Sequence, residues 1–158
     1  MMKRLLTIML TVSVVAGGLV GCSGGSGASE ELSAAEVAEH IQQAASLEDM
    51  KQGDMGKLQK LYHIEAENVE DFVLYTASSN VKAEELAIIK VKDAIEADNV
   101  LENIRQRIEA QKVKFQDYRP VEYFLIEKHV LKTKGRFIVF AVSEEAGRME
   151  DAFDEALK

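Results

Sequence analysis

The side chains best suited to metal binding or nucleophilic catalysis are scattered along this 158-residue chain. His40, His63 and His129 are far apart, and no two of them have the spacing of metal ligands on one helix or strand. A serine nucleophile on a strained turn would need a motif such as Gly-x-Ser-x-Gly, which does not occur. Gly24 and Gly25 stand in a Ser/Gly-rich segment, so they do not form a phosphate-binding loop between a strand and a helix. We therefore expect no catalytic residue, no metal and no cofactor.

Carboxylates are more abundant, with 27 in the chain. The acidic run at 65–71 has the oxygen ligands that calcium prefers, but it lacks the ligand spacing and the central glycine of an EF-hand loop. A solvated loop is the simpler interpretation. Glycoside cleavage needs two carboxylates that face each other, and a chain with this many acids always offers candidate pairs. A small hydrolase or transferase that uses carboxylates therefore stays open as an alternative function.

Basic residues are concentrated in the middle of the chain. Between 105 and 136 there are nine basic residues against four acidic ones, although the whole chain has a formal net charge of −8. If the helix and the hairpin expected here pack together, four of these side chains form an anion-binding surface: Arg105, Lys112, Lys134 and Arg136. The alternative is that their aliphatic stems cover the rim of a sheet, while pairs such as Arg105 with Glu109 neutralise their charges.

The N-terminus has the order of a secretory signal. Lys3 and Arg4 precede an uncharged, mostly apolar run from Leu5 to Val20. Its 16 residues fall short of the roughly 20 that a membrane-spanning helix needs. The run ends in Leu-Val-Gly-Cys at 19–22, which resembles the bacterial lipobox and implies that the thiol of Cys22 carries a diacylglycerol anchor. We expect a signal peptide at 1–21, a lipidated cysteine with a flexible tether at 22–32, and a single domain at 33–158.

An anchored chain of this kind would lie on the extracytoplasmic face of the cell membrane. Removal of the signal peptide leaves 17 basic and 27 acidic residues, a net charge of 17 − 27 = −10. Such a charge argues against nucleic acid as a partner. Cys22 is the only cysteine, so the folded part has no disulfide and no thiolate metal ligand.

Helix and strand signals alternate after the tether. Ser33 and Glu36 form a capping box for a helix at 34–45, and a weaker helix is expected at 54–62. An acidic connector at 63–71 leads to strands at 72–76 and 86–91, and then to a long helix from 98 or 99 to 117. The segment 121–127 fits a helix or a strand. A hairpin around Lys134-Gly135 joins strands at 130–133 and 136–142, and Ser143 caps a last helix. The fold class is α+β, with about four mainly antiparallel strands in the order β-β-α-β-β and packed helices.

From about 86 to 143 the chain resembles a family of bacterial lipoproteins, mostly Gram-positive, defined as a domain of unknown function (family 4358). The features that carry this resemblance are the strand at 86–92, the helix with Arg107, Gln111, Lys112 and Phe115, the residues Tyr118, Pro120 and Tyr123, and the Lys134-Gly135 hairpin. The resemblance implies a location and a shared domain, and it implies no reaction.

Together, these patterns predict a lipid-anchored extracytoplasmic protein that acts as a non-catalytic binding or interaction module at the cell envelope. Its expected partners are the membrane, through the anchor, and an anionic envelope polymer or an envelope protein. The alternative is a small cell-envelope hydrolase or transferase.

Overall fold

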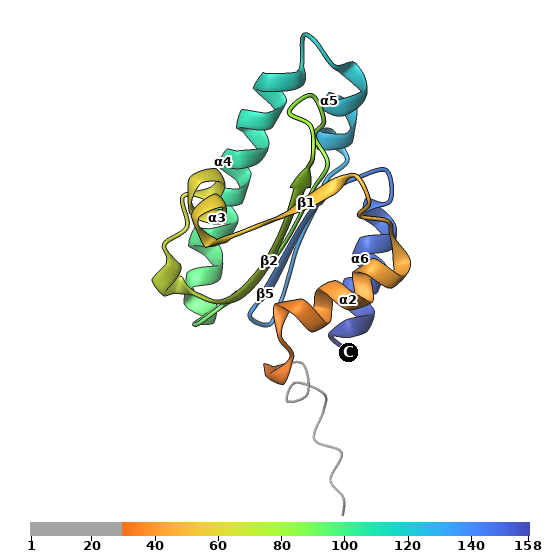
Figure 1. The fold of residues 1–158 in the computed structure, drawn as a ribbon. Coiled ribbons are helices and arrows are strands. Elements are labelled where there is room, and N and C mark those ends of the chain that lie inside the picture. The colour runs from red at the N-terminus through yellow and green to blue at the C-terminus, as the bar shows by residue number, and fades with distance from the viewer. Residues whose placement is uncertain (1–29) are drawn as a thin grey trace, which may run out of the picture.

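The computed structural model describes residues 30–158. The predicted signal peptide, Cys22 and the predicted tether up to residue 29 lie outside the described residues. Within the described part, one five-stranded sheet has helices on both of its faces, which gives three layers (Figure 1). The α+β class with antiparallel strands expected from the sequence is confirmed.

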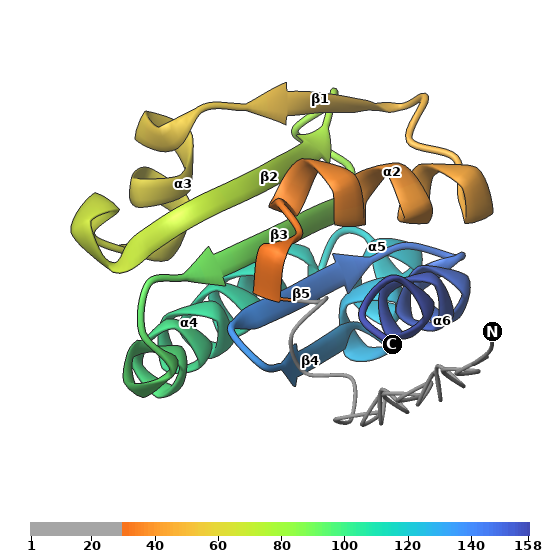
Figure 2. The ribbon, with the colours of Figure 1, turned by 90° about the horizontal axis from the view of Figure 1, so that it is seen from below.

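The strands are antiparallel to each neighbour and follow the order β1-β2-β3-β5-β4 (Figure 2). Their bounds are β1 Met50–Gly53, β2 Val69–Ala77, β3 Glu85–Val91, β4 Val130–Lys134 and β5 Phe137–Val142. The central strand β3 is buried along its whole length, and so is β5 beside it. This agrees with the continuous apolar run at 137–142, which is typical of a strand covered on both faces. Gly135 forms the β4–β5 turn with a left-handed φ of 57°, a conformation that glycine adopts without steric cost.

The sheet differs most from the sequence expectation at two places. The sheet has a fifth strand, β1, which the sequence pattern hides because it has only four residues and exposes the polar side chains of Lys51 and Gln52. The second strand begins at Val69 rather than at Phe72. Val69 pairs with Val91 across a register shift that precedes Asp71, so the end of the acidic connector belongs to the sheet.

The helices are α2 Ala34–Ala44, α3 Met55–Tyr62, α4 Ala97–Phe115, α5 Pro120–Glu127 and α6 Ala146–Ala156. The capping box at the start of α2 is confirmed, because the hydroxyl of Ser33 accepts from the backbone of Glu36 and the Glu36 carboxylate accepts from the backbone of Ser33. The segment at 121–127 is helical. Pro120 occupies its first turn, where a missing N–H costs nothing.

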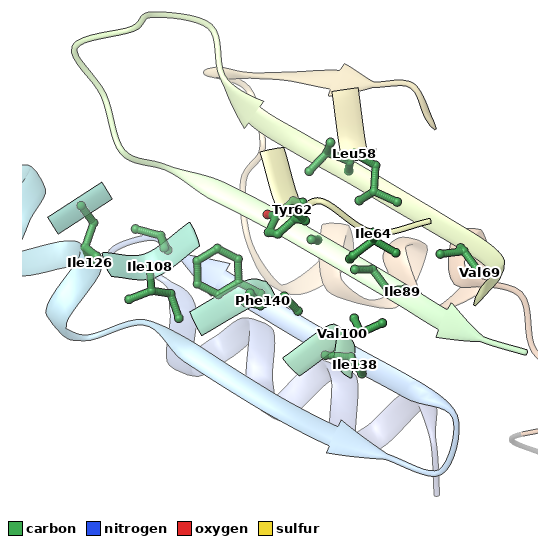
Figure 3. Packing of buried hydrophobic residues seen from close by; sticks show 14 of the residues in the cluster. Leu58, Tyr62, Ile64, Val69, Ile89, Val100, Ile108, Ile126, Ile138 and Phe140 are labelled. Atoms are coloured by element: carbon green, nitrogen blue, oxygen red, sulfur yellow. The ribbon is translucent and has the colours of Figure 1, made fainter. Parts of the chain in front are cut away.

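Each face of the sheet has its own apolar core. Helices α3, α4 and α5 cover one face, where Leu58, Ile108 and Phe140 belong to the buried cluster (Figure 3). The ring of Tyr62 in this cluster meets the ring of Phe140 edge-on, with centroids 6.3 Å apart. Helices α2 and α6 cover the other face, where Ile41 and Phe153 are fully buried. This division decides which side chains of β3 face which helices.

Candidate functional site

Two charged side chains are buried on the central strand β3. Glu85 stands at its first residue and Lys90 near its last, and their exposed fractions are 2% and 4%. Because side chains alternate along a strand, residues five apart point to opposite faces of the sheet. Glu85 therefore meets α3 and α4, whereas Lys90 points to the face that α2 covers. A buried charge needs a partner, and the two charges obtain theirs in different ways.

The Glu85 carboxylate accepts hydrogen bonds from side chains of two helices. The Tyr62 hydroxyl at the end of α3 donates to it, and Arg107 on α4 donates through Nη2 at 2.8 Å and Nε at 3.3 Å. Gln111, one turn further along α4, lies at the limit of hydrogen-bonding distance, 3.5 Å. The cluster therefore ties two helices to the centre of the sheet.

The protonation states in this cluster follow from its burial. Burial first, and then the negative charge of Glu85, raise the pKa of Tyr62 well above its ordinary value, so the phenol keeps its proton and donates it. Burial acts to lower the pKa of Arg107, but the hydrogen bond and charge of Glu85 outweigh this effect and raise it. Glu85 and Arg107 thus form an ion pair with a neutral phenol beside it.

A pocket of about 300 Å³ opens above this ion pair. Residues from α3, the β2–β3 loop, the two adjacent strand ends and α4 surround it. Its polar lining consists of Lys57, Thr76, Ser79, Asn80, Lys82, Glu84, Glu85, Arg107, Gln111 and Lys114. Thr76, Glu85 and Gln111 are buried, so the floor of the pocket is both polar and fixed.

Cations dominate the wall of the pocket. Lys57 donates to the Thr76 hydroxyl at 2.6 Å, and the Lys114 ammonium lies 4.5 Å from the centre of the Phe115 ring. Among the described residues neither of these two lysines has a carboxylate partner within salt-bridge distance. Lys82 does have one, since its Nζ lies 3.2 Å from the carboxylate of Glu122.

The carboxylates near the pocket have their own roles. Glu122 is buried on α5, accepts from the backbone N–H of Ala83 at 2.9 Å and pairs with Lys82, so it ties α5 to the β2–β3 loop. Burial raises the pKa of Glu84, Lys82 opposes this, and the negative charge of Glu122 adds to it. Glu85 is fully committed to Arg107 and Tyr62. Within residues 30–158 no three His, Cys, Asp or Glu side chains gather into a group that could hold a metal ion.

The other buried charge closes the opposite end of the sheet. The Lys90 ammonium donates to the carbonyl oxygens of Glu30 and Leu32 at 2.8 and 2.9 Å, and it lies 2.9 Å from the carboxylate of Glu70. Arg136 binds the carboxylates of Glu30 and Glu70. Hydrogen bonds from Lys90 and Arg136 lower the pKa of Glu70. Residues 30 and 32, which the sequence places in the tether, therefore contact the domain.

The four predicted anion-binding cations lie in two places. Arg105 and Lys112 are on α4, where their partners are Glu102 at 3.7 Å and Glu109 at 3.0 Å. Lys134 and Arg136 flank the β4–β5 turn. Lys134 donates to the carbonyl of Asp154 at 3.1 Å, and Arg136 binds the acids named above. The end of α4 that carries Lys112 is distant from the β4–β5 turn (Figure 1). The structure therefore brings these residues together in pairs, and anion binding by them stays a prediction.

Exposed apolar side chains gather beyond the pocket, around α5 and the β2–β3 loop. Tyr118 is 84% exposed, Val121 65% and Phe124 53%, and Val81 of the loop is also exposed. Two hollows border them. One, of about 380 Å³, lies between Val81, Tyr118 and Val121, and another, of about 490 Å³, lies between α5 and the start of α6. We call Val81, Tyr118, Val121 and Phe124 the apolar end. It lies at the opposite end of the domain from the start of α2 (Figure 1).

A family described as Domain of unknown function (DUF4358) matches residues 43–143. The chain belongs to this family. The match covers all five strands, the Glu85 cluster and the pocket above it, and it reaches further toward the N-terminus than the resemblance at 86–143. No curated protein and no solved structure matches the chain. Among residues 30–158 of this DUF4358 protein, no helix combines the length and the apolar character that crossing a membrane requires.

Sequence reasoning singled out Arg105 and Lys112 on α4 but missed the residues that line the pocket. The available signal was the spacing of Arg107, Gln111 and Lys114. Residues separated by four and then three positions share one face of a helix, so these three polar side chains form a second stripe beside the apolar one. These side chains lie near Lys57 and Glu85 because α3 and α4 pack on the same face of the sheet. The spacing of residues within α4 does not predict this packing.

Proposed function

We propose that this chain is a lipid-anchored extracytoplasmic protein that acts as a non-catalytic interaction module at the cell envelope and binds a partner protein through its apolar end. The observation that supports it is the cluster of Tyr118, Val121 and Phe124, which expose large apolar side chains together. Contiguous exposed apolar surface costs hydration free energy, and on soluble proteins it commonly marks an interaction site. Two aromatic rings next to hollows are also the kind of anchor that contributes most to binding energy.

The charges around the apolar end favour one kind of partner. Lys82 and Arg119 line the hollow beside Val121, and Lys128 lies over the ring of Phe124 at 4.2 Å from its centre. An apolar centre with a cationic rim is complementary to a protein surface that presents apolar side chains between carboxylates. Two carboxylates also border these hollows. Glu122 is buried and already pairs with Lys82, and Glu144 lines the hollow between α5 and α6, so the three cations still outnumber the acids.

The proposed anchor fits this arrangement. The start of α2 lies at the opposite end of the domain from the apolar end (Figure 1). Only seven residues separate Cys22 from residue 30, so lipid on Cys22 would hold the domain close to the bilayer. The apolar end would then point away from the membrane, toward partners in the envelope.

Two measurements on the full chain in its native host membrane test the proposal. A photo-crosslinking side chain replaces Val121, and a matched control replaces Gln43, which is exposed on α2 at the other face. We expect a discrete adduct from position 121 that Arg119→Glu removes, and no such adduct from position 43. Cys22→Ala should release the protein from the membrane fraction or leave it unprocessed, and it should abolish labelling with radioactive palmitate. Identical crosslinking from both positions would refute the interaction surface, and an unchanged palmitate signal in the alanine variant would refute the anchor.

A further inference from the structure

We infer that the pocket above Glu85 binds a small ligand through an oxyanion group, either a phosphate or a carboxylate. This site is distinct from the apolar end and from the four cations that the sequence singled out. Three cationic side chains from two helices line it: Lys57, Lys114 and Arg107. The Thr76 hydroxyl of β2 lies beside Lys57 at 2.6 Å and supplies a fourth polar contact.

The guanidinium of Arg107 has donor capacity left after it binds Glu85. Its Nη2 and Nε donate to the carboxylate, while Nη1 donates to no acceptor among the described residues. No buried side-chain nitrogen or oxygen in this part of the chain lacks a partner, so Nη1 must reach solvent. The side chain is 17% exposed and lines the pocket, which makes this edge of the guanidinium available to an oxyanion.

Glu85 makes the arginine rigid without removing its free edge. A guanidinium presents five N–H groups in a planar fork, and Glu85 uses two of its nitrogens. The Tyr62 hydroxyl and Gln111 donate to the Glu85 carboxylate and fix it, and the carboxylate in turn holds the guanidinium plane. A ligand that binds the remaining edge therefore loses little conformational freedom of the protein, and such preorganisation favours affinity.

The charge of the lining selects anions. The lining contains four cations, Lys57, Lys82, Arg107 and Lys114, and two carboxylates, Glu84 and Glu85. Its formal charge is therefore 4 − 2 = +2. Counting Glu122, which binds Lys82 from outside the lining, leaves +1. This positive pocket occurs in a chain whose formal net charge is −8. The volume of about 300 Å³ is at the lower end of small-molecule sites.

The test is a titration of the full chain, labelled with ¹⁵N and held in detergent micelles, with amide shifts as the readout. The probes are inorganic phosphate, glycerol 3-phosphate as a soluble headgroup fragment, and acetate, each against sodium chloride at the same ionic strength. We expect saturable shifts of the amides of Thr76, Ser79 and Gln111. Tighter binding of either phosphate probe than of acetate assigns a phosphate group, and the reverse assigns a carboxylate. Preference between the two phosphate probes distinguishes a free ion from a headgroup.

Two pairs of substitutions test whether the pocket is the site at which the anion binds. Lys57→Gln with Lys114→Gln removes the two ammonium groups without touching the buried ion pair. We expect binding to weaken about tenfold, the effect of losing about 1.4 kcal/mol of charge-assisted contact. Lys51→Gln with Lys60→Gln removes the same charge from two exposed positions outside the pocket, and should leave binding unchanged. Shifts that match the chloride control, or equal weakening by both pairs, would overturn the inference. Matching thermal unfolding of both variants shows that the fold is intact.

Discussion

Glu85 and Lys90 are two buried charges on one strand, and they differ in what surrounds them. Lys90 is enclosed by its own chain: two backbone carbonyls, the carboxylate of Glu70 and the ring of Phe137 surround the ammonium. Glu85 is neutralised from below, but its partner Arg107 also faces an open pocket. A buried charge that is satisfied on every side secures the fold. A buried charge whose partner keeps a free edge can serve a ligand as well.

The largest expected effect concerns the ion pair itself. Arg107→Gln leaves the Glu85 carboxylate buried without its counter-ion, and such a loss costs about 3–5 kcal/mol of unfolding free energy. The measurement is chemical denaturation of the full chain in detergent. Glu85→Gln combined with Arg107→Gln should recover part of the loss, because no uncompensated charge remains. A double variant less stable than the single one would contradict the view that the unpaired charge is the cause.

A smaller loss of unfolding free energy is expected at the end of the sheet that Lys90 closes, which we call the closed end. Lys90→Met removes the donor to the carbonyls of Glu30 and Leu32 and should cost about 1–3 kcal/mol, because those carbonyls lie near the surface and water can replace the ammonium. Chemical denaturation of this variant and of Arg107→Gln under the same conditions compares the two losses of unfolding free energy. If Lys90→Met proved the more destabilising of the two, the closed end would be the more important for stability, contrary to our account.

The Tyr62 hydroxyl makes the stability of the Glu85 cluster depend on pH. Its folded-state pKa is raised by burial and by Glu85, so the stability that it contributes is fully present below the ordinary tyrosine pKa of about 10 and is lost as pH rises through the folded value. Tyr62→Phe should lower stability by about 1 kcal/mol at neutral pH and reduce the further decline above pH about 10. Denaturation of both proteins at a series of alkaline pH values checks this. Parallel alkaline declines would show that Tyr62 does not titrate in this way.

The smallest effect is expected where Arg136 meets the chain at Glu30. This carboxylate is 44% exposed, and exposed ion pairs contribute about 0–1 kcal/mol. Glu30→Gln should therefore leave the unfolding transition almost unchanged, and the difference from wild type should disappear in high salt. A loss as large as that of Lys90→Met would mean that the N-terminal segment is held chiefly by this pair.

Much of the fold was predictable because its signals are local. The capping box of Ser33, the Lys134-Gly135 turn and the apolar run at 137–142 each specify structure within a few residues. Strand β1 was not predictable, because its four residues gain their stability only by pairing with β2. The pocket was hidden for a related reason. Glu85 is 22 residues from Arg107 and 23 from Tyr62, so the sequence shows the cations of α4 but not which face meets a buried acid.

The domain thus has one end closed around its own charges, and we propose that the other end is open for a partner. Hydroxyl-radical footprinting of Tyr118 and Phe124 tests this proposal, with the full chain in its native membrane compared with the purified chain in detergent. Both rings are exposed in the structure, so both should react rapidly when purified. Our account predicts strong protection of the two rings in the membrane. Equal reactivity in the two preparations would contradict it.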